Sequence, residues 1–169
     1  MESDHPLMTI ASISSPTQPS EPYSKGFPEA LFDQRHGIVG DFNEGWIGYS
    51  GADSIEYLVK LKKLEKVNQV SLGFCHSAPD WVIRPWNVQV QYSTNGKEWS
   101  EWQSCLSVNL PNDVANDGKR VRAFLRLGKK GVKNVRYLKL RIIGAKTLPI
   151  WHPYHGEPAW TMIDEIEIR

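Results

Sequence analysis

Residues 86–99 have the sequence WNVQVQYSTNGKEW, and this stretch decides the fold class of the chain. Its valines, Val88 and Val90, and the following Tyr92 alternate with asparagine and glutamine side chains. Such alternation is typical of a β-strand with one buried side and one solvent-facing side. The Asn95-Gly96 pair then predicts a tight turn into a further strand, because both residues adopt positive φ angles easily.

The same period of two recurs on either side of this stretch. Apolar residues alternate with polar ones at 54–63 and 135–144, and further strand candidates lie at 69–75, 101–108, 120–127 and 163–169. No segment keeps an apolar stripe of period 3.6 for three helical turns, and only residues 28–34 suggest a short helical turn. Many short strands separated by turns predict an all-β fold, an antiparallel β-sandwich jelly roll of about eight strands.

Composition and charge narrow the class of protein further. A length of 169 residues, with 40% apolar and 23% charged residues, suits one globular domain. The net charge of +1 gives no long-range electrostatic field that would recruit nucleic acid or an anionic membrane. Residues 1–22 are rich in Ser, Pro and Thr and predict a linker or an extended arm laid over the fold, so the domain itself is predicted at 23–169. Residues 1–22 lack the features of a signal peptide, so we expect an exported protein to carry its signal outside this chain.

The order of several motifs resembles that of discoidin-type domains, the galactose-binding-like jelly rolls that include the coagulation factor 5/8 C domains and the family-32 carbohydrate-binding modules. ALFDQRHG lies at 30–37, GWIGYSG at 45–51 and WTMIDEIEI at 160–168, and the strongest likeness is the segment YSTNGKEW at 92–99. The resemblance covers residues 23–169 in order and is greatest to the versions appended to secreted bacterial glycoside hydrolases.

This resemblance implies a non-catalytic domain that binds its partner through loops at one end. It implies a glycan as the partner, with the chain's own catalytic domain as a further candidate, and an extracellular, periplasmic or cell-surface location. Phospholipid binding, the function of the coagulation-factor relatives, is less favoured because the terminal loop has no basic residue between Lys146 and Arg169.

Many discoidin-type domains hold a structural Ca²⁺ ion, and the resemblance maps two carboxylate ligands to Asp33 and Glu165. Calcium takes six to eight oxygen ligands, so backbone carbonyls of residues 31–37 would complete the shell. The chain departs from the family pattern, because Gln34 follows Asp33 where glycine is usual, and Ile38 and Val39 stand where Ser or Thr is expected. The alternative is that Asp33 caps a turn and Glu165 is the outward residue of a strand.

The loop at 145–161 combines aromatic rings, imidazoles and prolines. Flat rings stack on the apolar faces of sugars, polar groups bond the hydroxyls, and prolines reduce the entropy lost on binding. We therefore expect Trp151, His152 and His155 to face a ligand and Trp160 to lie in the core. The alternative is that this aromatic set closes one end of the sandwich.

Two further loops carry ligand candidates. In HSAPDWVIRPW, at 76–86, these are His76, Trp81 and Arg84, because a guanidinium beside an indole can bond vicinal hydroxyls. The alternative is that the arginine stacks on the tryptophan. In the glycine-rich stretch 44–51 the candidate is Trp46, with packing as its alternative. The tryptophans on or beside predicted strands are expected to be core or sheet-face residues: Trp86, Trp99 and Trp102.

Sequence patterns that would indicate an enzyme are weak. HPYHGE, at 152–157, gathers two histidines and a glutamate, but Pro153 opposes the helix that a zinc-binding histidine pair requires. Cys75 and Cys105 leave buried free thiols and a disulfide both open. The sequence therefore predicts a carbohydrate-binding accessory domain of a secreted glycoside hydrolase, and the alternative is a structural or protein-docking domain with no sugar site.

Overall fold

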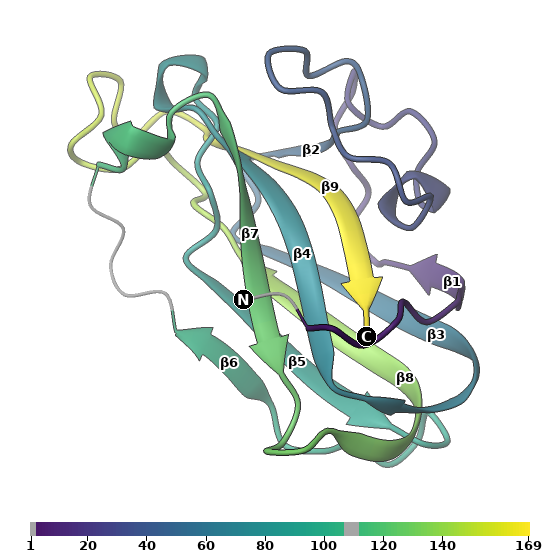
Figure 1. Cartoon of the computed structure of the whole chain (residues 1–169). Helices are drawn as coiled ribbons and strands as arrows, with labels where there is room; N and C mark the ends of the chain where they lie inside the picture. The colour runs from purple at the N-terminus through teal and green to yellow at the C-terminus, as the bar shows by residue number, and fades with distance from the viewer. Residues whose placement is uncertain (1–2, 107–111) are drawn as a thin grey trace.

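The computed structural model describes residues 3–106 and 112–169, which form a two-layer β-sandwich (Figure 1). One layer is a five-stranded sheet in the order β1-β3-β8-β5-β6, and the other is a four-stranded sheet in the order β2-β9-β4-β7. Every pair of neighbouring strands among the described residues is antiparallel. The predicted all-β jelly-roll sandwich is therefore confirmed. The strands are β1 (Ile10–Ser14), β2 (Ile47–Ser50), β3 (Ser54–Val67), β4 (Gln69–His76), β5 (Asn87–Ser93), β6 (Gln103–Leu106), β7 (Lys119–Arg126), β8 (Val132–Ile143) and β9 (Trp160–Ile168).

The period of two predicted β3, β5 and β8 correctly because each presents one face to the opposite sheet. Tyr57 of β3 pairs with Leu140 of β8, and Val59 pairs with Leu138, and all four side chains are fully buried. Burial of each such aliphatic side chain stabilises the fold by about 1.5–3 kcal/mol. The Tyr57 hydroxyl donates a hydrogen bond to the hydroxyl of Tyr49 at 2.8 Å, which satisfies both polar groups inside this core.

Two short strands were not predicted. β1 lies within the stretch before Tyr23 and pairs with β3, and the backbone N–H of Met8 donates to the carbonyl of Ile168 at 2.8 Å. β1 therefore forms the edge of the five-stranded sheet, while Met8 bonds to β9 of the other sheet. β2 pairs with β9, and its sequence IGYS is too short to show a period.

The link between β5 and β6 differs from the predicted tight turn. It spans residues 94–102, and the Asn95 side-chain oxygen accepts hydrogen bonds from the backbone N–H groups of Lys97 and Glu98. Asn95-Gly96 thus starts a longer loop, in which only Gly96 has a positive φ, of 77°. The last two residues of the strand predicted at 101–108 lie outside the described residues.

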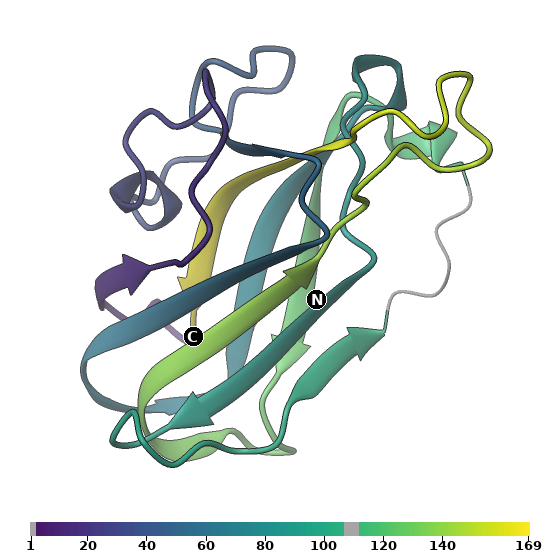
Figure 2. The ribbon, with the colours of Figure 1, turned by 180° about the vertical axis from the view of Figure 1, so that it is seen from behind.

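The remaining elements are three turns of 3-10 helix: η1 (Glu29–Leu31), η2 (Ala78–Asp80) and η3 (Val114–Asn116). η1 confirms the helical turn predicted near residues 28–34. Among the described residues there is no helix of the length and apolarity needed to cross a membrane. Figures 1 and 2 show that the loop before β2, the loop carrying η2 and the loop between β8 and β9 gather at one end of the sandwich.

Several side chains lie where their sequence contexts predicted. The indoles of Trp99 and Trp102 carry the cations of Lys139 and Arg141, at 4.1 and 4.2 Å from the ring centroids. The two cations stand on the solvent side of β8, which confirms these tryptophans as sheet-face residues. Both cysteines, Cys75 and Cys105, are free thiols.

Candidate functional site

The β8–β9 loop is a closed hairpin that carries a compact tip. Thr147 bridges to Pro158, and the backbone N–H of Leu148 donates to the carbonyl of Glu157 at 2.7 Å. Beyond this closure the chain turns through the proline-rich tip, where the N–H of His152 donates to the carbonyl of Pro149 at 2.9 Å. The prolines therefore shape a loop with its own hydrogen bonds.

His152 fastens this tip to the neighbouring loop and does not face a ligand. Its ring is 5% exposed, and its Nε2 lies 2.8 Å from the carbonyl of Ala78. Its Nδ1 accepts a hydrogen bond from the backbone N–H of Tyr154 at 3.0 Å. Nε2 therefore carries the proton and both ring nitrogens are occupied, so the predicted ligand role of His152 is wrong.

Trp81 packs against the same tip. Its indole centroid lies 5.4 Å from the ring of Tyr154 at 40° between planes, and 6.5 Å from the ring of His152. Tyr154 remains 59% exposed, so it covers Trp81 from the solvent side. Trp81 is half-buried and one face of its indole is occupied, which supports the packing alternative.

Two other predicted ligand residues are held by neighbouring groups. Trp46 is 3% exposed, and its Nε1 donates to the carbonyl of Ile38 at 3.0 Å. A Cβ on Gly37 would lie 2.1 Å from this indole, so the ring is sealed beneath that backbone. His76 is 1% exposed, and burial lowers its pKa; its Nδ1 accepts from the backbone N–H of Arg84 at 3.3 Å. Trp46 and His76 therefore lie in the interior, which contradicts the prediction that they face a ligand.

Arg84 and His155 remain near the surface. The Arg84 guanidinium lies 3.2 Å from the Asp113 carboxylate, so its charge is already paired. His155 is exposed at the loop tip, with its Nδ1 3.2 Å from the carbonyl of His152. The predicted ligand residues therefore do not form a single site. Three of them share one aromatic cluster: Trp81, Trp151 and His152.

A surface hollow lies on the other side of the same loop, and Trp151 and Trp86 line it. Its volume is about 540 Å³, and Ala145 and Leu148 form part of its buried apolar lining. Both tryptophans are half-buried, so part of each residue stays exposed, and both line the hollow. We name this surface the two-tryptophan hollow.

The rim of the two-tryptophan hollow carries polar side chains of opposite charge. Asp53, just before β3, and Lys146, just after β8, are exposed and line the hollow. Ile150 lies beside them and is 87% exposed. Trp86 was predicted only as a core or sheet-face residue. Its position between Pro85 and the start of β5, at the end of the sheet, is the sequence signal that could have placed it here.

The two predicted metal ligands, Asp33 and Glu165, come together between η1 and β9. Glu165 is 2% exposed; its Oε1 accepts from the backbone N–H of Gln34 at 3.2 Å, whereas its buried Oε2 has no hydrogen-bond partner in the described structure. Burial raises the pKa of Glu165 to about 9, the Gln34 hydrogen bond opposes the shift, and the nearby Asp33 carboxylate adds to it. Asp33 is exposed, and its Oδ1 accepts from the backbone N–H of Arg35 at 2.9 Å, as in the turn-capping alternative. The unbonded oxygen of Glu165 is an oxygen donor of the kind that calcium prefers.

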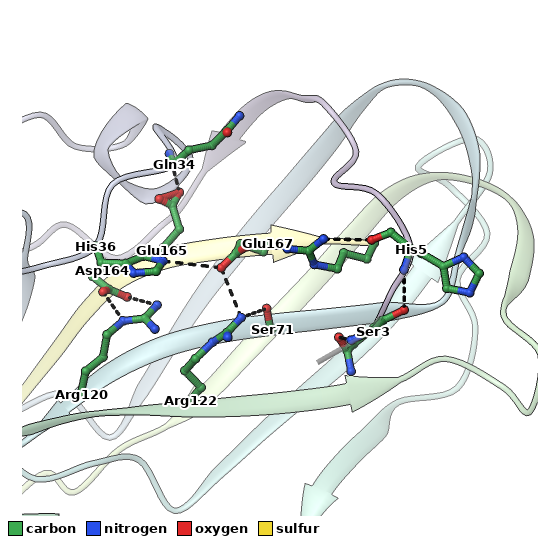
Figure 3. A network of polar contacts seen from close by, with 12 residues as sticks. Ser3, His5, Gln34, His36, Ser71, Arg120, Arg122, Asp164, Glu165 and Glu167 are labelled. Carbon is green, nitrogen blue, oxygen red and sulfur yellow. Dashed lines mark hydrogen bonds and ion pairs between the residues drawn. The ribbon is translucent and has the colours of Figure 1, made fainter. Parts of the chain in front are cut away.

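Asp164, which the sequence analysis did not select, holds the same loop from the other side. Its carboxylate accepts from Arg120 Nε at 2.5 Å and from the backbone N–H of Gly37 at 2.9 Å. Figure 3 shows Asp164 pointing to Arg120 and Glu165 pointing to Gln34. Adjacent residues of β9 therefore pin the loop after η1 at two points. Among the described residues no group of three or more His, Cys, Asp or Glu side chains is arranged to hold a metal.

Comparisons with known proteins show the fold. No family model and no curated protein sequence matches the chain. An F5/8 type C domain from Bacteroides fragilis aligns over 95% of each chain with a TM-score of 0.55 and 10% identity. A fucose-binding module from Streptococcus pneumoniae aligns over 93% of this chain and 89% of its own, with a TM-score of 0.52 and 15% identity.

A third similar structure has a different function. The N-terminal domain of a single-strand break repair protein aligns over 96% of both chains, with a TM-score of 0.55 and 12% identity. The chain therefore has the discoidin-type fold that its motif order predicted, which confirms that resemblance. At these identities the likeness shows the fold alone, so the function depends on this chain's own side chains.

Proposed function

We propose that this chain is a non-catalytic carbohydrate-binding module and that the two-tryptophan hollow is its sugar site. The observation that carries the proposal is that two half-buried indoles, Trp86 and Trp151, line one open hollow. Sugars present apolar C–H faces edged by hydroxyls, so a partly exposed ring takes the face and nearby polar groups take the hydroxyls. Asp53 accepts hydrogen bonds and Lys146 donates them at the rim.

The chemistry of the hollow supports binding without catalysis. Asp53 is the one carboxylate among its lining residues, whereas hydrolysis of a glycosidic bond by the usual mechanism requires a pair. A shallow site with two rings and two polar groups suits weak binding, with a Kd of about micromolar to millimolar. Such affinity is useful when the module holds a tethered partner near a glycan.

The test is glycan binding by the intact chain. A glycan array identifies a bound sugar, and isothermal titration then compares the wild type with Trp151→Ala. We expect Trp151→Ala to weaken binding at least about tenfold, as for loss of one stacked ring of ~1.4 kcal/mol. Trp99→Ala is the matched control, because Trp99 is also half-buried but lies on the sheet face.

Asp53→Asn and Lys146→Met test the rim without disturbing the packing, since both side chains are exposed. A sugar bound equally well by all of these variants would place the site elsewhere. A silent array, with every variant folded, would oppose sugar binding. Turnover of a chromogenic glycoside by the chain would oppose the non-catalytic role.

Docking onto a catalytic domain of the same protein is the second candidate function. The observation that favours it is the exposure of Ile150, at 87%, and Tyr154, at 59%, on the tip of one loop. Exposed apolar groups that protrude together suit contact with a protein partner. Docking would be supported if Tyr154→Ser released such a domain while leaving sugar binding intact, because Tyr154 does not line the two-tryptophan hollow. The parent glycoside hydrolase and the location outside the cytoplasm stay predictions.

A structural Ca²⁺ ion at Asp33 and Glu165 is a separate proposal. The unbonded buried oxygen of Glu165 supports it. With backbone carbonyls of the loop after η1, the two carboxylates would hold the ion, which would neutralise a charge that burial otherwise disfavours. Its expected role is to fix that loop against β9. Calcium titration of the wild type and Glu165→Gln by calorimetry tests it, and equal heats from both would contradict it.

A further inference from the structure

The end of the sandwich opposite the two-tryptophan hollow carries a second hollow, of about 440 Å³. It lies between the turn that joins β3 to β4, the turn that joins β7 to β8, and the N-terminal segment around Ser3 and His5. Four cationic side chains line it: Lys66, Arg126, Lys129 and Lys130. We name it the basic hollow.

None of these four cations forms an ion pair with another described residue, and three of them are lysines. By contrast, the guanidiniums of Arg120 and Arg141 each contact a carboxylate within 3 Å. The chain as a whole has a net charge of only +1, so the basic hollow is a local segregation of charge. A concave surface with an excess of positive over negative side chains concentrates anions near it.

Exposed lysines extend the charge beyond the hollow. Lys62 and Lys63 on β3 and Lys133 on β8 are exposed and close in sequence to its lining residues. The acidic residues in the same segments are fewer: Asp4 lines the hollow, and Glu65 is half-buried on β3. Exposed lysines therefore lie on both of the paired strands β3 and β8 that lead to the hollow, which suits an extended anion better than a single small one.

The turn that presents Lys129 and Lys130 has a fixed shape. Gly128 and Gly131 flank the two lysines with φ angles of 61° and 84°. A Cβ on Gly131 would lie 2.4 Å from the Asn68 side-chain oxygen, so glycine is needed for the two turns to pack together. The lysines therefore project from a constrained turn beside Asn68.

From these observations we infer that the basic hollow binds an acidic polysaccharide, a chain whose sugars carry sulfate or carboxylate groups. Ammonium and guanidinium groups would meet the anionic groups, and the hydroxyl and amide of Ser3 and Asn68 would meet the sugar hydroxyls between them. A volume of about 440 Å³ lies within the range of sugar-sized ligand sites.

Two other polyanions fit this surface less well. The lining holds no Phe, Tyr or Trp, and proteins that bind single-stranded nucleic acid combine basic grooves with aromatic rings on which bases stack. Anchoring to an anionic membrane takes apolar side chains as well as charge. Leu64, 49% exposed between the lysines of β3, is a single such side chain beside a concave surface.

The two hollows lie at opposite ends of β8. This strand has 12 residues, so at about 3.3 Å per residue its ends are ~35 Å apart. The basic hollow is thus independent of the proposed sugar site, and one chain could contact two different glycans or two places on one long chain. A failure of the acidic-polysaccharide inference and a failure of the sugar-site proposal can therefore be measured separately.

The test measures binding of a size-defined heparin oligosaccharide, which carries sulfate and carboxylate groups, to the intact chain by fluorescence anisotropy. We expect binding that weakens as salt is raised, because charge contacts release counterions. The double variant Lys129→Glu/Lys130→Glu should lose at least about tenfold in affinity, since each reversal replaces an attraction with a repulsion. Lys25→Glu/Lys119→Glu is the matched control, with the same charge change on exposed lysines at the other end.

Further probes separate the sources of the anionic chemistry. Polygalacturonate carries carboxylates alone, so its binding relative to heparin shows which group the hollow prefers; binding of either supports the inference. Equal losses in the two double variants would overturn it, as would no binding of either glycan at low salt. An oligonucleotide of equal charge, or phosphatidylserine vesicles, binding more tightly than both glycans would also overturn it. Trp151→Ala should leave heparin binding unchanged.

Discussion

Replacing Glu165 with glutamine is expected to remove a dependence of stability on pH. Burial raises the pKa of Glu165 from 4.5 to about 9, so the folded chain keeps a proton that the unfolded chain releases between these values. The stability that protonated Glu165 preserves is fully present below the pKa of this group in the unfolded chain, and it is lost as pH rises toward the pKa in the folded chain. The free energy of unfolding should therefore fall by about 1.4 kcal/mol for each pH unit in that window.

Over an assay range from pH 5 to pH 8 this amounts to about 4 kcal/mol. Urea unfolding, followed by tryptophan fluorescence with a chelator present, should show that decline for the wild type relative to Glu165→Gln. The comparison between variants matters because buried His76, whose pKa is lowered, acts with the opposite sign and gains stability as pH rises through about 6.5. That contribution is present in both proteins and cancels.

Calcium provides the second half of the test. If the ion binds the deprotonated Glu165, adding it at pH 8 should restore stability to the wild type, by about 2.7 kcal/mol at a hundred times its Kd. Glu165→Gln should gain much less. The reasoning is refuted if the wild type and the variant have parallel pH profiles, because Glu165 would then not be the buried acid that titrates in this window.

Two further predictions concern packing and thiol reactivity. A Cβ on Gly73 would lie 2.0 Å from Asp164 Oδ1 and 2.3 Å from Arg120 Nη2, so Gly73→Ala should displace this ion pair and lower the free energy of unfolding in urea by about 2–4 kcal/mol. A loss below about 1 kcal/mol would mean that the pair relaxes freely. Burial raises the pKa of Cys75 to about 11, so maleimide at pH 8 should label Cys75 only after unfolding. Mass spectrometry measures this labelling. Equal labelling of Cys75 and of half-exposed Cys105 in the native chain would contradict the prediction.

The strands β3, β5 and β8 could be predicted from sequence because burial largely alternates along them. Val88 and Val90, for example, face the opposite sheet while Gln89 between them does not, and such alternation is visible in one chain. β1 was not predicted because it is an edge strand with a single buried residue, Ile13, and so has little apolar pattern to detect.

The candidate site was harder to predict because a ring's residue type does not show which of its faces is covered. Trp46 and Trp151 both lie in loops rich in glycine or proline, yet Gly37 seals the first and the second borders a hollow. His152 was predicted to face a ligand because an imidazole among aromatic rings can bond sugar hydroxyls, but both of its ring nitrogens are used within the fold. Trp86 was passed over because it adjoins a strand, although that strand begins at the end where the loops gather.

The central claim, that sugar binds between Trp86 and Trp151, can be tested most directly by indole N–H resonances in a ¹⁵N-labelled chain. Each of the seven tryptophans contributes one side-chain signal, and substitution assigns them. Titration with the sugar selected by the array should shift the signals of Trp86 and Trp151 and leave that of buried Trp46 in place. Saturable binding that moves neither of the two signals would contradict the claim.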